Sequence, residues 1–554
     1  MLLKTLHDDQ TTLSQSRQLP AAIRSLCPIC RAIVDAELYE DDGRVMMSKN
    51  CTQHGNFTEL ISSDVEFFLK ICRTHYERPD KIENPHSVNT SHCPEACGLC
   101  EQHVSRPAMV NIDLTNRCNM NCPICFANSN ATGSVCELTL QQVKKMLDAA
   151  ANIRPRGPAC LQFVGGEPTI HPDFIECIRQ AKTRGISHVQ VATNGLKFAQ
   201  SLEFCQAASD AGLDQLYLQF DGLSDEVYMK IRGRALMETK QKAIDNIRKA
   251  NIRVVLVPTI VKGLNDDQVG NIARYAVDNV DTISAISWQP VAITGRIDES
   301  ERLSMRYTMA DLARDLEQQC GFPVMQRDWY PYSIVTPFLR LMTAMKGTPQ
   351  ISVSCHPHCG AATYMVVDRQ TKEVTPLPAF IDIEPAMADL DKMAARIEKF
   401  PWLKSITVAS AMKAMKKHFH QQRAPKDWGF DRFLEFVQSF ADFEQQHADK
   451  AAYHEYLNEQ RFCTLLFASM HFQDVYNYEI QRSKHCIILY AAPNGRFYPF
   501  CTWNSGPCHR YPIEERFAKP LQKVSNIRGI DTVKSIGFSR RGGNKNQQHA
   551  ARSD

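Results

Sequence analysis

The stretch MVNIDLTNRCNMNCPIC, residues 109–125, is a short apolar strand followed at once by three cysteines. Cys118, Cys122 and Cys125 form a C-x3-C-x2-C array. Three thiolates this close together fit three corners of a [4Fe–4S] cluster, whereas a four-cysteine zinc site usually comes as two separated C-x2-C pairs. No fourth cysteine follows at the short ferredoxin-like spacing, so the array predicts a cluster with one iron open to a ligand.

Beyond the array, helices with a 3.6-residue period alternate with short apolar strands. This rhythm predicts parallel strands with helices outside. The expected strands are 109–115, 160–165, 188–194, 215–222, 254–261 and 283–290, and the expected helices are 140–153, 172–185, 198–212, 240–251 and 268–279. Six strands are too few for a closed eight-stranded barrel, so we expect an α/β fold built on a partial (β/α)6 barrel. The array then lies in the first strand-to-helix loop, on the face where such barrels do chemistry.

Polar residues also follow the next three predicted strands. Gly165, Gly166, Glu167 and Pro168 end the second strand. The two glycines allow close backbone approach to a ligand, and the carboxylate can pair with an ammonium group. Asn194 and Asp221 end the third and fourth strands, where they either contact a ligand or cap the following turns.

Composition describes an ordinary globular protein of 554 residues, with 44% apolar residues and a net charge of +3. No nucleic-acid partner follows from that charge. No apolar run is long enough for a transmembrane segment or a leader, which predicts a cytoplasmic protein. In such a reducing compartment the 21 cysteines indicate metal or redox sites more than disulfides.

The remaining chain divides by composition. We expect a disordered N-terminus (1–20), a zinc-ribbon or rubredoxin-like domain (21–75), an auxiliary iron–sulfur segment (76–106), the partial barrel (107–300), a helical and C-terminal cluster-binding domain (301–520) and a largely disordered tail (521–554).

The first small domain carries a C-x2-C … C-x2-H set around a predicted hairpin. Cys27, Cys30, Cys51 and His54 are its expected ligands, and Cys72 competes with His54 for the fourth place. The spacing favours zinc, with a mononuclear iron as the alternative.

Two further cysteine groups predict auxiliary clusters. Cys93, Cys97 and Cys100 repeat the C-x3-C-x2-C spacing without a preceding strand, and His103 is a candidate for the fourth ligand. A second auxiliary site is expected from Cys355, Cys359, Cys486 and Cys501, with Cys463 and Cys508 as alternatives.

The array and the GGEP sequence together resemble the radical S-adenosylmethionine (SAM) enzymes. Longer stretches, among them CPEACGLCEQH, FVGGEPTIHPDF, LQFDGLSDEVY and SCHPHCGAATY, resemble the subgroup that contains archaeal tetraether lipid synthase and an archaeal pterin C-methylase. The resemblance implies that SAM binds the open iron through its amino and carboxylate groups, with the GGEP loop holding the amino group. Asn194 and Asp221 would stand where the family contacts ribose and carboxylate.

The implied reaction is cleavage of SAM to a 5′-deoxyadenosyl radical that removes hydrogen from an unactivated carbon. Carbon–carbon bond formation would follow, either C-methylation of a pterin-like molecule or coupling of lipid chains. The resemblance also implies an electron donor such as flavodoxin or ferredoxin. Two alternatives remain open, namely radical modification of a peptide or other macromolecule, and an electron carrier or metal scaffold without radical chemistry.

Overall fold

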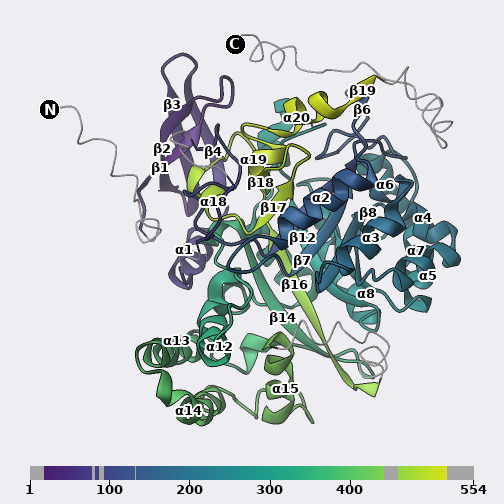
Figure 1. Cartoon of the computed structure of the whole chain (residues 1–554). Helices are drawn as coiled ribbons and strands as arrows, with labels where there is room; N and C mark the ends of the chain where they lie inside the picture. Colours follow the sequence, from purple (N-terminus) through teal and green to yellow (C-terminus); the bar gives the residue numbers. More distant parts are fainter. Residues whose placement is uncertain are drawn as a thin grey trace.

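The computed structural model describes residues 18–77, 81–86, 93–130, 133–297, 299–441 and 459–520 (Figure 1). Most of the expected disordered N-terminus and all of the tail 521–554 lie outside these residues.

A four-stranded antiparallel sheet forms the N-terminal domain. Its strands pair in sequence order and are β1 (Ala21–Leu26), β2 (Ile33–Asp41), β3 (Arg44–Cys51) and β4 (Gly55–Ser62), followed by helix α1 (Val65–Arg73). The predicted hairpin joins β2 to β3, where Asp42 and Gly43 both have positive φ, as a tight two-residue turn requires.

The main sheet contains the six predicted parallel strands in sequence order. They are β5 (Met109–Thr115), β7 (Cys160–Gly165), β8 (His188–Thr193), β9 (Gln215–Gln219), β10 (Arg253–Val257) and β12 (Ile283–Pro290), with short β11 (Thr259–Ile260) beside β12. The curled half-barrel sheet expected from the sequence is therefore confirmed.

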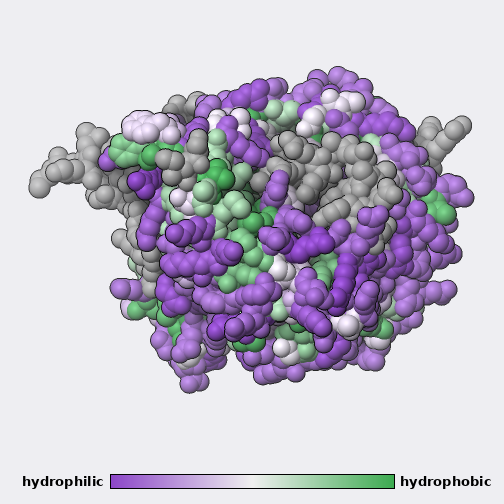
Figure 2. Space-filling view, turned by 90° about the horizontal axis from the view of Figure 1, so that it is seen from below, coloured by the Kyte–Doolittle hydropathy of each residue, from purple (hydrophilic) through white to green (hydrophobic). Residues whose placement is uncertain are grey.

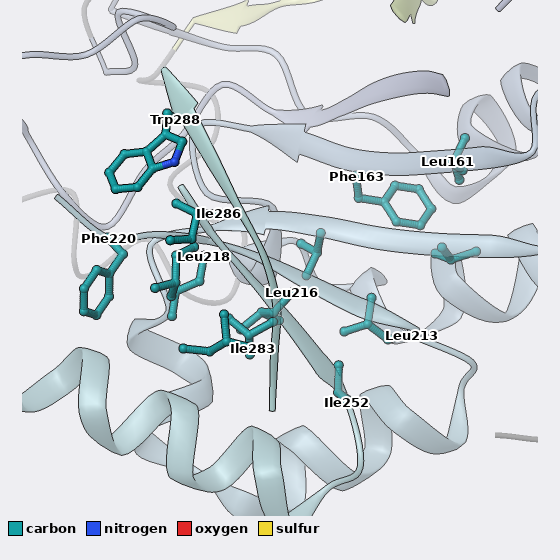
Figure 3. Close-up of a cluster of buried hydrophobic side chains, with 14 of the residues drawn as sticks. Leu161, Phe163, Leu213, Leu216, Leu218, Phe220, Ile252, Ile283, Ile286 and Trp288 are labelled. Carbon is teal, nitrogen blue, oxygen red and sulfur yellow. The ribbon is translucent and has the colours of Figure 1, made fainter. Parts of the chain in front are cut away.

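Helices cover the outer face of these strands, where alternate side chains pack in one large core (Figure 3). The helices are α2 (Leu140–Ala151), α3 (Phe174–Lys182), α4 (Leu196–Gln200), α5 (Leu202–Asp210), α6 (Asp225–Arg232), α7 (Met237–Lys249) and α8 (Val269–Asp278). The helix predicted over 198–212 is divided because Ser201 is extended and caps α5 through its side chain. Helix α6 was not predicted.

Two C-terminal strands extend the half-barrel at both edges. β16 (Phe462–Met470) lies parallel to β12, and β17 (Ile488–Ala491) lies parallel to β5. The chain between them, residues 471–487, connects opposite edges of the half-barrel. We call it the crossing segment. It contacts the loops that follow β5 and β12, since the Phe472 ring lies 5.9 Å from that of Phe126 and Asp474 accepts a hydrogen bond from the backbone N–H of Ile293 (2.8 Å).

Much of the rest of the C-terminal half is helical, and it also contains β14 (Gly360–Asp368), a strand antiparallel to β16. This strand lies within a region that the sequence indicated to be mostly helical. The other elements are β6 (Ser134–Val135), β13 (Tyr330–Pro331), β15 (Val374–Pro376), β18 (Phe497–Pro499), β19 (Lys519–Pro520), α9 (Arg302–Met305), α10 (Met309–Cys320), α11 (Met325–Asp328), α12 (Thr336–Lys346), α13 (Ile383–Lys399), α14 (Lys404–Lys417), α15 (Phe430–Ala441), α18 (Ile480–Lys484), α19 (Phe500–Asn504) and α20 (Arg510–Phe517).

Figure 2 shows a face of the molecule that is mostly hydrophilic, with smaller apolar areas between the polar side chains. Among the described residues, no helix has both the length and the apolar character needed to cross a membrane.

Candidate active site and metal centres

The first array lies in the loop after β5, at the carboxyl end of the half-barrel. Cys118, Cys122 and Cys125 are partly buried, and their sulfurs are close enough to interact electrostatically. Burial and the neighbouring acidic groups raise the pKa of Cys118. Thiols held this way lose protons most readily when they bind a cation, so the three side chains fit a metal cluster.

The glycine pair at the end of β7 presses directly against this loop. Gly165 has φ of +141°, and a Cβ there would lie 2.3 Å from the carbonyl oxygen of Thr115. A Cβ on Gly166 would lie 2.1 Å from the carbonyl oxygen of Arg117, next to Cys118. Two backbone hydrogen bonds of 2.8 Å, from Gly166 to Thr115 and from Glu167 to Arg117, hold the loops together.

The Glu167 carboxylate joins this loop to the end of β8. It accepts hydrogen bonds from the hydroxyls of Thr169 (2.6 Å) and Thr193 (2.8 Å) and from the backbone N–H of Asn194 (2.8 Å). Glu167 is buried, and burial raises its pKa. The carboxylate thus holds two strand ends together, while the amide of Asn194 donates to Asn119 within the array (2.7 Å).

Asp221 is fully buried and binds Arg232, a residue that the sequence reasoning missed. The guanidinium donates to both carboxylate oxygens, at 2.7 and 2.8 Å, and to the carbonyl oxygen of Ile124 at 3.0 Å. It also interacts electrostatically with the Cys122 thiol. Arg232 therefore brings a positive charge to the array and links the array to the end of β9. Both oxygens of the Asp221 carboxylate are engaged in this bidentate ion pair.

Two more basic residues approach the same region. Lys240 on α7 is buried and donates to the carbonyl oxygen of Asn194 (2.6 Å), and burial lowers its pKa to about 7. Arg296, after β12, donates to the carbonyl oxygen of Cys122 (2.8 Å). Gly295 allows this approach, because a Cβ there would lie 2.3 Å from the carbonyl oxygen of Cys125.

The N-terminal ligand set is assembled as predicted. Nδ1 of His54 lies 3.6 Å from the Cys27 sulfur and 3.5 Å from the Cys51 sulfur, and the Cys30 and Cys51 sulfurs are 3.9 Å apart. One ligand atom from each of the four residues lies within 4.8 Å of the others. These separations suit tetrahedral zinc. Cys72 is not a competitor, because its sulfur lies 2.9 Å from Nε2 of His358.

Comparison with known proteins agrees with both sites. The sequence model of the radical SAM superfamily matches residues 112–276, and that of an HMPTM N-terminal zinc ribbon domain matches residues 19–63. A 7,8-dihydro-6-hydroxymethylpterin dimethyltransferase of Methanocaldococcus jannaschii is 37% identical over 507 residues, which cover 91% of this chain and 97% of the relative. The chain belongs to this radical SAM family.

More distant matches cover a smaller part of the chain. A GTP 3′,8-cyclase of Chlorobaculum tepidum is 30% identical over 219 residues, covering 38% of this radical SAM enzyme and 64% of the relative. The crystal structure of Streptococcus suis SuiB matches with a TM-score of 0.32 and 18% identity, covering 39% of this chain and 46% of that one. Membership in the family implies a [4Fe–4S] cluster, SAM and a zinc site.

The upstream array of this radical SAM enzyme surrounds a small cavity. Cys93, Cys97 and Cys100 line it together with His103 and Lys484. Nε2 of His103 lies 2.8 Å from the carbonyl oxygen of Cys486, and burial lowers the pKa of this histidine to about 4. The ring therefore has one nitrogen engaged away from the thiols. Cys97 also packs with Val164 of β7, which places the upstream array against the barrel strands.

The four cysteines predicted to form a second auxiliary site are brought together from two separate regions. Electrostatic interactions link Cys359 with Cys355, Cys486 and Cys501. The buried Arg482 guanidinium donates to the Cys359 sulfur. The alternatives lie elsewhere, since Cys463 packs in the main core and the thiol of Cys508 donates to the carbonyl oxygen of Asn504 at 3.5 Å.

Proposed function

We propose that this radical SAM enzyme forms a carbon–carbon bond on a polar heterocycle of the pterin class, by C-methylation. The observation that carries the proposal is a row of polar side chains across the inner face of the half-barrel. Asn111, Gln162, Gln190 and Gln215 are consecutive partners in the parallel register of β5, β7, β8 and β9, and Tyr490 of β17 pairs with Asn111.

The row faces away from the outer helices, because the intervening residues of the same strands pack in the helix-covered core (Figure 3). Asn111, Gln162 and Gln190 are nevertheless at most 6% exposed. Buried amides require hydrogen-bond partners, and Oδ1 of Asn111 has none within the described part of the chain. A pterin ring carries donors and acceptors that suit amides, whereas an alkyl chain would leave the Asn111 oxygen unpaired.

Lipid coupling gains no comparable support. Coupling of long chains would need an apolar tunnel, and the apolar stretches 335–345 and 461–472 are the candidates to line one. Leu465 and Phe467 pack in the main core beside Trp288, and Leu341 packs in a second core under α13. These side chains are explained by packing, so they do not indicate a tunnel. The relatives reported above carry no lipid-coupling name.

The same proposal assigns the site residues. Cys118, Cys122 and Cys125 hold the SAM-binding cluster, and Gly165, Gly166, Glu167, Pro168, Asn194 and Asp221 form the SAM-binding edge. When bound, the cluster and SAM supply a 5′-deoxyadenosyl radical that removes hydrogen. The chain's own residues exclude water, because Tyr490 and Trp503 lie in one buried apolar cluster with Val164 of β7.

The two other cysteine groups lie next to each other, and this supports a role for them in supplying electrons to the SAM-binding cluster. Tyr478 interacts electrostatically with Cys93, Cys97 and Cys501, and Thr502 lies 3.8 Å from the Cys97 sulfur. We assign an auxiliary [4Fe–4S] cluster to each group, Cys93/Cys97/Cys100 and Cys355/Cys359/Cys486/Cys501, with an electron donor such as flavodoxin or ferredoxin. The domain boundaries and the cytoplasmic location stay predictions.

The test is substrate-dependent cleavage of SAM under anaerobic reduction. Addition of 7,8-dihydro-6-hydroxymethylpterin should accelerate 5′-deoxyadenosine formation, and an archaeal lipid diether should not. Gln162→Leu should abolish the acceleration while leaving the basal rate, whereas Gln206→Leu, on exposed α5, should match the wild type. Acceleration by the lipid alone, or an unchanged response in Gln162→Leu, would contradict the proposal.

A further inference from the structure

A second metal site lies outside the predicted cysteine groups. His356, His358 and Glu479 each offer one ligand atom, and the three atoms lie within 4.8 Å of one another. Nε2 of His356 is 3.3 Å from one Glu479 oxygen, and Nδ1 of His358 is 3.9 Å from the other. All three residues are buried, with at most 5% exposure. No family assignment reported above includes them.

We propose that these residues bind one divalent transition-metal ion. Ligand atoms about 2.1 Å from a common ion stand about 3.0–3.4 Å apart, so the 3.3 Å separation lies within the range of a bound set and the 3.9 Å separation lies about 0.5 Å above it. Two imidazoles and one carboxylate are a known ligand combination for zinc and for non-haem Fe(II). The position of the ion is between the rings and the carboxylate.

The hydrogen bonds around the three ligands support this arrangement. Nε2 of His358 faces the Cys72 sulfur at 2.9 Å, so Nδ1 is the nitrogen directed at Glu479. A hydrogen-bond partner on the ring nitrogen that does not bind the ion orients a metal-binding histidine. Nε2 of His356 is buried and has no hydrogen-bond partner of ordinary geometry among the described residues. An ion satisfies that nitrogen and the carboxylate together.

The surroundings leave room to complete the coordination. A cavity of about 20 Å³ is lined by His358, His471, Asn477 and Arg482, and this is enough for a water molecule. Nε2 of His471 also has no partner within the described part of the chain. The rest of the cavity lining is mainly apolar, so the site offers three protein ligands and, beside His358, space for one water molecule.

The ion would connect three parts of the protein. Glu479 belongs to the crossing segment, the two histidines immediately precede β14, and Cys72 lies on α1 of the N-terminal domain. Its expected role is to fix the crossing segment against the half-barrel. The competing arrangement contains no metal. The backbone N–H of His358 donates to Nδ1 of His356 (3.3 Å), so Nε2 of His356 would carry the proton and donate it to Glu479.

The test is metal analysis of the full chain purified without oxygen. The iron of the clusters equals the acid-labile sulfide, and this amount is subtracted from the total transition-metal content. The remaining transition-metal ions are counted per chain. We expect two in the wild type, one after Cys30→Ala, which removes the zinc-ribbon ion, and one after Glu479→Gln. In Cys30→Ala, absorption-edge spectroscopy of the remaining ion should show nitrogen and oxygen ligands without sulfur. His418→Gln, at a buried histidine beside Asp389, is the matched control and should keep both ions.

Cys72→Ser provides a second readout that does not remove a ligand. Titration with Zn²⁺ alone, after chelation of the non-cluster ions, should show about 10–100-fold weaker binding at the second site. Three results would overturn the proposal: one non-cluster ion in the wild type, two ions retained by Glu479→Gln, or unchanged zinc affinity in Cys72→Ser.

Discussion

Gly166→Ala tests whether contact between the GGEP loop and the first cysteine array is required for SAM cleavage. The new Cβ would lie 2.1 Å from the carbonyl oxygen of Arg117, whereas carbon–oxygen contacts are ordinarily about 3.3 Å or longer. The loop must therefore withdraw by about 1 Å. The obstructing atom is a backbone oxygen next to Cys118, so rotating a side chain cannot relieve the contact.

A displacement of about 1 Å at a reacting centre can lower the rate about 100-fold. It also lengthens the two 2.8 Å backbone hydrogen bonds, whose loss costs about 1 kcal/mol each. We therefore expect 5′-deoxyadenosine formation to fall about 100-fold while iron and sulfide content stay at wild-type levels. Gly429→Ala is the matched control, because a Cβ there meets only a glutamine side-chain oxygen at 3.6 Å. A fully loaded Gly166→Ala enzyme with wild-type SAM cleavage would refute the reasoning.

Three further perturbations follow from the buried charges. Arg232→Met removes the guanidinium that joins Asp221, Ile124 and the Cys122 thiol, so the first array should bind less iron. This iron is measured in a Cys97→Ala/Cys355→Ala background, which removes the other clusters. An unchanged iron content there would contradict the role of Arg232 in holding the array. Arg306→Met leaves the buried carboxylates of Asp474 and Glu59 without the positive charge of Arg306. The free energy of unfolding in urea should therefore fall by about 3–5 kcal/mol. Arg314→Met, at a more exposed ion pair, should lower it by less than about 1 kcal/mol. Burial lowers the pKa of Lys49 to about 8, so as the pH rises the folded state loses this proton before the unfolded state does. The free energy of unfolding of the wild type should therefore rise between pH 8 and 10 relative to that of Lys49→Met. Parallel pH profiles of the two proteins would exclude that effect.

The half-barrel and the chemistry at its strand ends were predictable because both are local in sequence. Helical and strand periods alternate from residue 109 to 290, and the array and the GGEP sequence directly follow strands. The close packing of Gly165 and Gly166 explains why two glycines stand there. The spacing of Cys27, Cys30, Cys51 and His54 similarly predicted the metal set.

What escaped prediction depends on contacts between distant residues. Nothing local indicates that β16 and β17 pair with opposite edges of the half-barrel. Arg232 was missed because helix α6, which begins at Asp225, was not recognised. The available signal was a basic residue at the end of that helix, 11 positions after Asp221. The ligand set of His356, His358 and Glu479 unites residues more than 100 positions apart, although the paired histidines of SCHPHCG were a visible hint.

The most direct test of the central claim is anaerobic cleavage of SAM after reduction with dithionite, with iron counted for each protein. The account predicts 5′-deoxyadenosine from the wild type and from Cys97→Ala, and none from Cys122→Ala. Product from Cys122→Ala but not from Cys97→Ala would contradict the account, because SAM would then be cleaved at the upstream array.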